Sequence, residues 1–289
     1  MSETDKVFAG SVPALYDRYL GPLLFEPYAI DLAGRFPHLT EGRLLETAAG
    51  TGILTRALDR ALPRDIQIVA TDLNQPMIDH AAGQLSSSRV TWRQADALDL
   101  PFEDTVFDAV ICQFGAMFFP DKVKAYEEVR RVLKPGGRFV FNVWDRIEEN
   151  EFAHLVTGAL TDLFPRNPPL FLARTPHGHH DLATIRDEIR QAGFTKLTCE
   201  TLACRSRAGS PRDPAIGYCQ GTPLRNEIEA RDAGRLAEAT AAASEAIAAR
   251  FGAGPVDGKI HAHIIVAGGG GRGRDGWASI PSLMPGSHR

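Results

Sequence analysis

The stretch "LLETAAGTG", Leu44 to Gly52, decides the fold of this chain. Two leucines lead into the carboxylate of Glu46, and small residues follow as far as Gly-Thr-Gly, directly before the helical pattern "ILTRALDRAL". This order predicts a buried strand, a tight turn and a helix. The N-terminal N–H groups of that helix would lie at the carboxyl edge of a sheet, where α/β proteins bind ligands.

The turn differs from one that binds a pyrophosphate. A dinucleotide-binding turn follows Gly-x-Gly-x-x-Gly, but after Gly50 and Gly52 the third position holds Thr55. Glu46, near the end of the strand, would repel a pyrophosphate and would suit a cofactor that carries an ammonium or sulfonium group. The turn therefore favours a cationic nucleoside over a nicotinamide dinucleotide.

Short β-rich runs alternate with helical patterns from Arg43 onward. Strands that are nearly continuously apolar and alternate with helices are typical of a parallel sheet covered on both faces. Asp121 and Asp181 each precede a helical pattern and are predicted to cap it. The predicted strands are "RLLETA", "IQIVATD", "RVTWRQAD", "FDAVICQFG", "RFVFNVW", "TKLTCETLACRSR" and "GKIHAHIIVAG".

Two further carboxylates stand at the ends of predicted strands. Asp72 comes 20 residues after Gly52 and can accept hydrogen bonds from the hydroxyls of a ribose. Asp96 ends the next strand beside the backbone N–H of Ala97, where the edge of an adenine could be read. Each aspartate alone could instead cap a helix or close a turn. Together, at the ends of successive strands, they predict a nucleoside site.

These segments, in their order and spacing, resemble the class I S-adenosylmethionine-dependent methyltransferases, in particular the small-molecule branch that includes the ubiquinone and menaquinone C-methyltransferases. The resemblance covers roughly Arg43 to Trp144. It implies a Rossmann-like α/β fold whose seven-stranded sheet has the order 3-2-1-4-5-7-6, with the last strand antiparallel. It rests on "LLETAAGTG", "VATDLNQPMI", "RQADALDLPFEDTVFDAVICQFGAMFFPD" and "EEVRRVLKPGGRFVFNVW".

The resemblance also implies roles for individual residues. Glu46 orients the methionine part of S-adenosylmethionine, Asp72 holds the ribose, and Gln113 lies beneath the reacting methyl group. Ala48 replaces the first glycine of the family's Asp-x-Gly-x-Gly-x-Gly turn, at little cost if its φ angle is negative. The implied cofactor-binding residues are Tyr19, Glu46, Ala48, Gly50, Gly52, Asp72, Leu73, Met77, Asp96, Ala97 and Gln113.

The segments around this core predict the organisation of the chain. Residues 1–42 read as N-terminal cap helices, and residues 43–267 as the methyltransferase domain. Insertions near 146–180 and 209–253 are expected to cover the acceptor. The Gly-rich residues 268–289 read as a disordered tail.

Composition limits the partners. The net charge of −4 and the pI of about 6.1 give no basic excess for nucleic acid or an anionic membrane. No apolar run approaches the ~20 residues that span a bilayer, and the start of the chain does not read as a signal peptide. We therefore expect a cytoplasmic enzyme without a nucleic-acid or membrane partner. The sequence leaves the oligomeric state open.

The expected reaction is transfer of a methyl group by in-line displacement to a small, partly apolar molecule, leaving S-adenosylhomocysteine. The sequence does not assign catalytic residues, and the candidates for a general base are His154, Asp145 and Tyr218. The "HGHH" run at 177–180 reads as solvated loop histidines, and no metal site is expected. The alternatives are a nicotinamide-dependent oxidoreductase and a non-catalytic S-adenosylmethionine-binding module.

Overall fold

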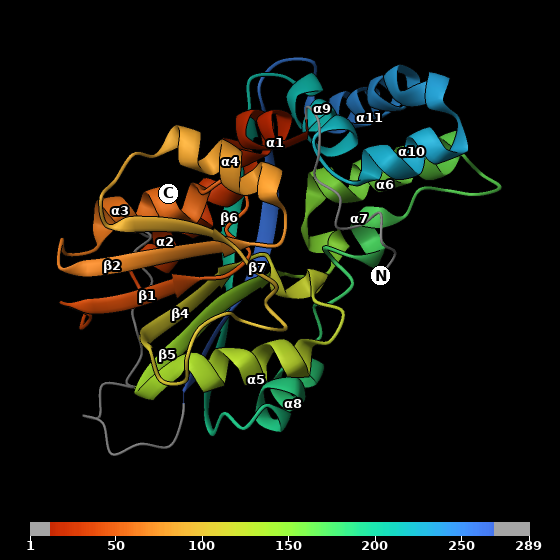
Figure 1. Cartoon of the computed structure of the whole chain (residues 1–289). Helices are drawn as coiled ribbons and strands as arrows, with labels where there is room; N and C mark the ends of the chain where they lie inside the picture. Colours follow the sequence, from red (N-terminus) through yellow and green to blue (C-terminus); the bar gives the residue numbers. More distant parts are fainter. Residues whose placement is uncertain (1–11, 269–289) are drawn as a thin grey trace, which may run out of the picture.

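The computed structural model describes residues 12–268, and a seven-stranded sheet runs through their centre (Figure 1). The strand order is β3-β2-β1-β4-β5-β7-β6, and β7 is antiparallel to both of its neighbours. The expected fold and strand order are confirmed. The strands are β1 (Gly42–Glu46), β2 (Ile66–Asp72), β3 (Val90–Gln94), β4 (Phe107–Gln113), β5 (Leu133–Trp144), β6 (Lys196–Ala208) and β7 (Val256–Gly268).

Strand β1 lies in the middle of the sheet, between β2 and β4. It pairs in parallel with both, so that Glu46 stands opposite Ala70 on one side and Ile111 on the other. Leu44 and Leu45 are completely buried. The carboxyl ends of β1, β2 and β4 therefore meet at one edge of the sheet, and the turns that follow them share that edge.

Helices cover both faces of the sheet. Figure 1 shows α2 (Glu26–Ala33) and α3 on one face and α5 with α8 on the other. The predicted caps form, since Asp121 accepts a hydrogen bond from the backbone N–H of Lys124, and Asp181 accepts one from that of Thr184. The helices that flank the central strands are α3 (Ile53–Ala61), α4 (Gln75–Gln84), α5 (Lys122–Val132) and α8 (Leu182–Gln191).

The N-terminal cap helices expected from the sequence are joined into one continuous helical segment. A π-helical stretch, η2 (Tyr16–Phe25), joins α1 (Val12–Leu15) to α2 (Glu26–Ala33) and contains Pro22. Proline has no N–H to donate and cannot continue a regular α-helical ladder. Tyr28 is fully buried and its hydroxyl lies 3.1 Å from the carbonyl oxygens of both Leu202 and Ile260, which ties α2 to β6 and β7.

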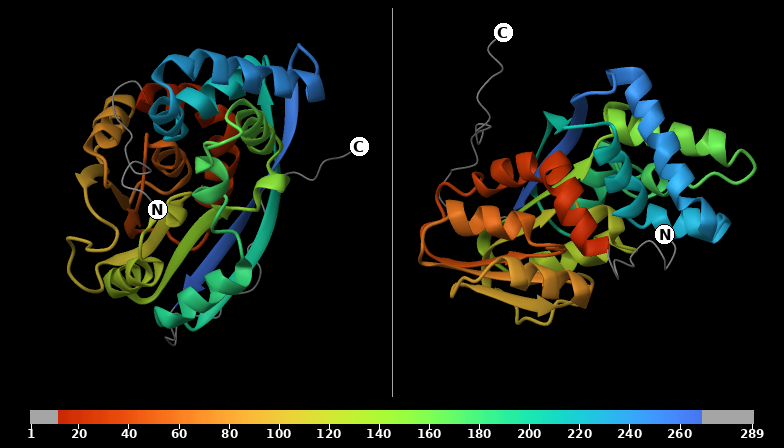
Figure 2. Two further views of the ribbon diagram at one scale, coloured as in Figure 1. Left: turned by 90° about the vertical axis from the view of Figure 1, so that its right-hand side faces the viewer. Right: turned by 90° about the horizontal axis from the view of Figure 1, so that it is seen from above.

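The two insertions form a helical layer at one end of the sheet, and Figure 2 shows its helices beside one another. The insertion near 146–180 contains two helices, α6 and the short α7. The layer consists of α6 (Glu151–Leu163), α7 (Phe171–Arg174), α9 (Arg212–Gln220), α10 (Leu224–Arg231) and α11 (Leu236–Phe251). Short 3₁₀ turns are η3 (Ala116–Phe118), η4 (Ile147–Glu149) and η5 (Ala233–Arg235).

Among residues 12–268, no helix combines the length and apolar character needed to cross a membrane. The predicted tail lies outside the described residues, apart from Gly268 at the end of β7.

Candidate active site

A cavity of about 870 Å³, which we call the strand-end cavity, opens where β1, β2 and β4 end. Most of the residues expected to bind the cofactor line it. They come from the turn after β1, the end of β2, the loop after β3 and the end of β4. Those lining residues are Ala48, Gly50, Asp72, Leu73, Met77, Asp96, Ala97 and Gln113.

Asp72 braces two of these turns. Its carboxylate accepts hydrogen bonds from the backbone N–H of Gly50 and from that of Asn74, both at 2.8 Å. Burial raises the pKa of Asp72, and these backbone N–H groups act against that rise. A carboxylate has about four lone-pair sites, so Asp72 keeps capacity for further donors in the cavity.

Glu46 lies beneath a hollow of about 290 Å³ that shares Tyr16, Ala48, Gly50 and Gln113 with the strand-end cavity. The residue is only 1% exposed, and the hydroxyl of Thr55 donates to its carboxylate at 2.6 Å. Burial raises the pKa of Glu46 to about 8, even though the Thr55 hydrogen bond acts in the opposite direction. Glu46 is therefore mostly protonated at neutral pH unless a cation enters the hollow.

Gln113 contributes a buried polar atom to both hollows. Its Oε1 has no hydrogen-bond partner among residues 12–268. Leaving a buried acceptor unpaired costs about 1–3 kcal/mol. This atom is therefore poised to receive a donor from a molecule that fills the cavity.

The backbone beside the cavity is strained at two non-glycine residues. Ala48 has a φ angle of +53°, so the condition under which the alanine would cost little is not met, and the residue occupies a left-handed conformation that glycine would adopt more readily. The methyl group of Ala48 packs against Gly115. Any larger residue at position 115 would place its Cβ only 2.4 Å from the Cβ of Ala48, so this contact requires glycine there. Phe114 has a φ of +49°, and its N–H donates to Oδ1 of buried Asn142 at 2.8 Å. Such strain is typical of ligand-binding positions.

Three of the expected residues do not line the strand-end cavity: Glu46 lines only the smaller hollow, and Gly52 and Tyr19 line neither. Gly52 packs inward, where a Cβ would lie 2.8 Å from the ring of Trp92. Tyr19 packs beside Gly217 of α9, and Tyr16 takes its place on the cavity wall. The π-helical geometry of this stretch changes which residues share a face, and α-helical spacing does not reveal it.

The far end of the cavity is open to solvent. Asp96 is exposed there, and its side chain accepts a hydrogen bond from the N–H of Leu98 at 2.9 Å. Leu73 is 43% exposed, whereas Met77 is buried. An apolar rim beside a carboxylate suits a flat ring with polar edges.

A second hollow, which we call the aromatic cavity, has a volume of about 550 Å³. Its wall is shared with the strand-end cavity at Tyr16, Phe114 and Phe118. The rings of Phe114 and Trp144 stack with centroids 3.7 Å apart. The remaining lining residues are Leu20, Leu24, Phe25, Trp144, Asn150, Phe171, Leu172, Pro176, His177, Tyr218, Thr222 and Pro223.

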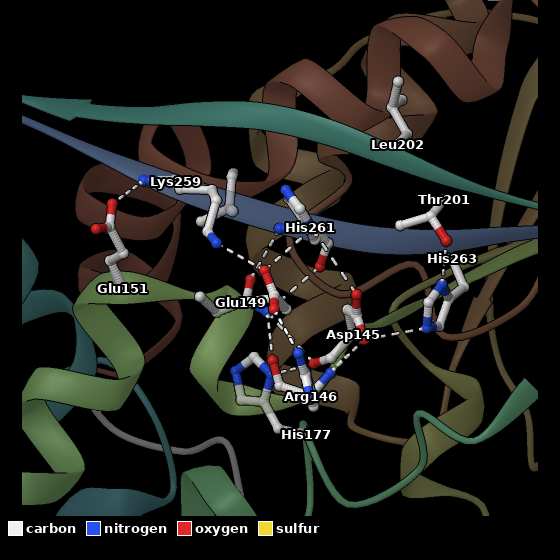
Figure 3. Close-up of polar contacts among 12 residues, drawn as sticks. Asp145, Arg146, Glu149, Glu151, His177, Thr201, Leu202, Lys259, His261 and His263 are labelled. Carbon is white, nitrogen blue, oxygen red and sulfur yellow. Dashed lines mark hydrogen bonds and ion pairs between the residues drawn. The ribbon is translucent and has the colours of Figure 1, made fainter.

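The three candidates for a general base lie in different places in the structure. His154 is exposed on α6 and lines neither cavity. The carboxylate of Asp145 faces His263, 3.2 Å away, and His261, 3.8 Å away, on β7 (Figure 3). Tyr218 is buried and lines the aromatic cavity.

His177 overturns the expectation of solvated loop histidines. It is only 5% exposed and lines the aromatic cavity, because α7 and the turn after it fold the loop inward. Its neighbours His179 and His180 do not line the cavity. Across the described residues there is no cluster of three potential metal ligands.

Comparison with known proteins identifies the family of this chain. The family described as "Methyltransferase domain" matches residues 45–141. The ubiquinone/menaquinone biosynthesis C-methyltransferase UbiE of Pseudomonas aeruginosa is 30% identical over 188 residues, which span 61% of this chain and 72% of that enzyme. The chain belongs to the class I S-adenosylmethionine-dependent methyltransferases. It is thus an enzyme whose cofactor is S-adenosylmethionine.

A further sequence relative and two solved structures of the same fold are also similar to this methyltransferase. UbiE of Burkholderia mallei is 33% identical over 163 residues, covering 53% of this chain and 67% of that one. The [4+2]-cyclase SpnF shares the fold with a TM-score of 0.59 and 21% identity, covering 90% of this chain and 94% of its own. The structure of phosphoethanolamine N-methyltransferase 2 of Haemonchus contortus, solved with S-adenosyl-L-methionine, has a TM-score of 0.57 and 17% identity. The match covers 89% of this chain and 57% of that one.

Proposed function

We propose that this methyltransferase methylates a small, partly apolar molecule held in the aromatic cavity, with S-adenosylmethionine in the strand-end cavity. One observation carries the proposal. The two cavities meet at a common wall of Tyr16, Phe114 and Phe118, so a ligand in each would meet across it. Alignment of two bound reactants is the main requirement of a displacement at an activated group.

The lining of the strand-end cavity suits the chemistry of this cofactor. Asp72 would accept hydrogen bonds from the ribose, and Asp96 with the N–H of Ala97 would read the adenine between Leu73 and Met77. Glu46 and the unpaired Oε1 of Gln113 would face the cationic methionine end. The bound cofactor supplies a methyl group that is already activated on a positively charged sulfur.

The residues of the aromatic cavity would orient the acceptor and exclude water. Phe171 of α7 and Phe118 of η3 lie with ring centroids 6.3 Å apart and close the side that faces the helical layer. No Asp, Glu, Lys or Arg appears among the lining residues described for this cavity. A charged acceptor would lose its hydration there without an ion-pair partner, so an uncharged molecule is favoured.

The test is methyl transfer from labelled S-adenosylmethionine to a panel of small molecules that vary in size, charge and apolar surface. We expect turnover with uncharged aromatic or aliphatic nucleophiles, and little with equally small charged ones. Turnover confined to highly charged molecules would contradict the proposal. Calorimetry with S-adenosylhomocysteine and NAD on the same sample serves as the cofactor control, and we expect only the first to bind.

A further inference from the structure

We propose that His177 selects the acceptor by accepting a hydrogen bond at Nε2 from a hydroxyl or N–H group of that molecule. The inference rests on the proposed function and specifies the acceptor further. It would be an uncharged, ring-sized apolar molecule that presents one donor to the wall formed by α7 and the turn after it.

The orientation of the imidazole comes from the end of β5. Nδ1 of His177 lies 2.9 Å from the backbone carbonyl oxygen of Asp145 (Figure 3). The same oxygen accepts a hydrogen bond from the side-chain amide of buried Asn150 at 3.3 Å. A carbonyl oxygen can only accept, so Nδ1 must carry the proton. Nε2 is then left with its lone pair.

His177 stays neutral in this position. Burial lowers the pKa of its imidazole to about 4, although the Asp145 hydrogen bond acts in the opposite direction. None of the described residues hydrogen-bonds to Nε2, and the ring packs against Trp144 with centroids 6.0 Å apart. His177 therefore offers the aromatic cavity an uncharged hydrogen-bond acceptor, Nε2, beside the ring of Trp144.

The other polar groups of this wall discriminate less. The hydroxyl of Thr222 is occupied, since it donates to the carbonyl of Tyr218 at 2.7 Å and accepts from the N–H of Leu224 at 3.2 Å. Both ends of the Asn150 amide already have partners. Its Nδ2 donates to the carbonyl of Arg146 at 3.1 Å, and its Oδ1 accepts from the backbone N–H of His261 at 3.3 Å. The Tyr218 hydroxyl can donate or accept, so it does not impose a choice.

His177 Nε2 can only accept. A buried site that hydrogen-bonds a hydroxyl discriminates against the analogue without it, because the protein group is then left unpaired. A ketone or ether in the same place would bring two acceptors together and would bind no better than a hydrocarbon. Selection for a donor therefore follows from the tautomer that Asp145 imposes.

The experiment uses 4-propylphenol and propylbenzene, which differ by one hydroxyl, with the full chain saturated with S-adenosylhomocysteine. Their affinities are measured by calorimetry for the wild type, His177→Leu and His177→Gln. His38→Leu is the matched control, because His38 is exposed beyond α2. Near-UV circular dichroism and S-adenosylhomocysteine affinity check that each variant folds.

We expect the wild type and His38→Leu to prefer the phenol by about tenfold. His177→Leu should bring that preference to about twofold or less, and His177→Gln, which keeps an acceptor oxygen, should recover part of it. If both probes bind but the preference survives in folded His177→Leu, the inference about His177 is wrong while the acceptor cavity stands. If neither probe binds the wild type, the acceptor cavity itself fails, and the inference fails with it.

Discussion

The two cavities are built in different ways. The strand-end cavity is lined almost entirely by the segment from Ala48 to Pro120, with Tyr16 as the exception, and its polar groups stand at the ends of successive strands. The aromatic cavity gathers side chains from four distant regions, 16–25, 114–150, 171–177 and 218–223. A rigid sheet edge thus presents fixed carboxylates to a polar ligand, whereas packed helices from separate parts of the chain enclose an apolar one.

The electrostatics follow the same division. The hollows at the strand ends contain Glu46, Asp72 and Asp96, whereas the aromatic cavity presents a neutral imidazole among rings. Changes on one side should therefore leave the other largely intact. Four experiments test that separation, beginning with the largest expected effect.

Removing an aromatic wall should separate acceptor turnover from cofactor binding. Phe171 is 1% exposed, and Phe171→Ala should lower the free energy of unfolding by about 3–5 kcal/mol and remove most turnover. The affinity for S-adenosylhomocysteine should change less than about threefold, because Phe171 does not line the strand-end cavity. Calorimetry and chemical denaturation measure both quantities, and Phe171→Leu provides a milder variant if the alanine variant does not fold. A parallel loss of cofactor affinity in folded Phe171→Leu would break the comparison.

Removing a strand-end carboxylate should have the opposite signature. Asp72→Ala should weaken S-adenosylhomocysteine by about 1–3 kcal/mol, the cost of losing charge-assisted hydrogen bonds. Some stability should also be lost, because the N–H groups of Gly50 and Asn74 donate to this side chain. Asp72→Asn is the isosteric control, and its affinity for S-adenosylhomocysteine should lie between those of the wild type and Asp72→Ala. Unchanged affinity in a folded alanine variant would show that Asp72 only braces the turns.

Binding of the cationic cofactor should release a proton from Glu46. Because burial raises the pKa of Glu46 to about 8, a cation in its hollow lowers that pKa and drives the proton off near pH 7. Calorimetry with S-adenosylmethionine in buffers of different ionisation enthalpy should detect release approaching about one proton per site. Glu46→Gln should remove most of this release. Equal release from the wild type and the glutamine variant would place the proton elsewhere.

The smallest expected effect concerns His177 and pH. Its folded pKa of about 4 lies below the ordinary value of 6.5, so between these values the unfolded chain binds the extra proton and stability falls as pH falls. The slope from this residue is at most about 1.4 kcal/mol per pH unit. The raised pKa of Glu46 makes stability rise as pH falls towards 4.5. This contribution is the same in the wild type and in His177→Leu, so it cancels in the comparison. Urea unfolding from pH 4 to 7 should therefore show a shallower acid loss for His177→Leu than for the wild type; identical profiles would mean that His177 does not titrate in this way.

Much of the fold could be predicted because its signals are local. Alternating apolar runs and helical patterns predicted each strand and the caps Asp121 and Asp181, and the structure contains them. Placement of the site residues was less uniform. Asp72 and Asp96 reach one cavity because parallel strands bring their carboxyl ends to one edge. Tyr19 does not, because Pro22 lies in a π-helical stretch whose geometry the sequence spacing does not reveal.

By itself the sequence determined the order of strands and helices, and it predicted a cationic cofactor from Glu46 and the approximate limits of the insertions. Only the tertiary structure decided that His177 is buried, that Tyr16 rather than Tyr19 reaches the cavity, and that Ala48 takes a positive φ. The physical reason is the range of the interactions. Periodicity and turn chemistry act over a few neighbouring residues, whereas burial of a loop histidine depends on α7, β5 and α9 coming together from distant parts of the chain.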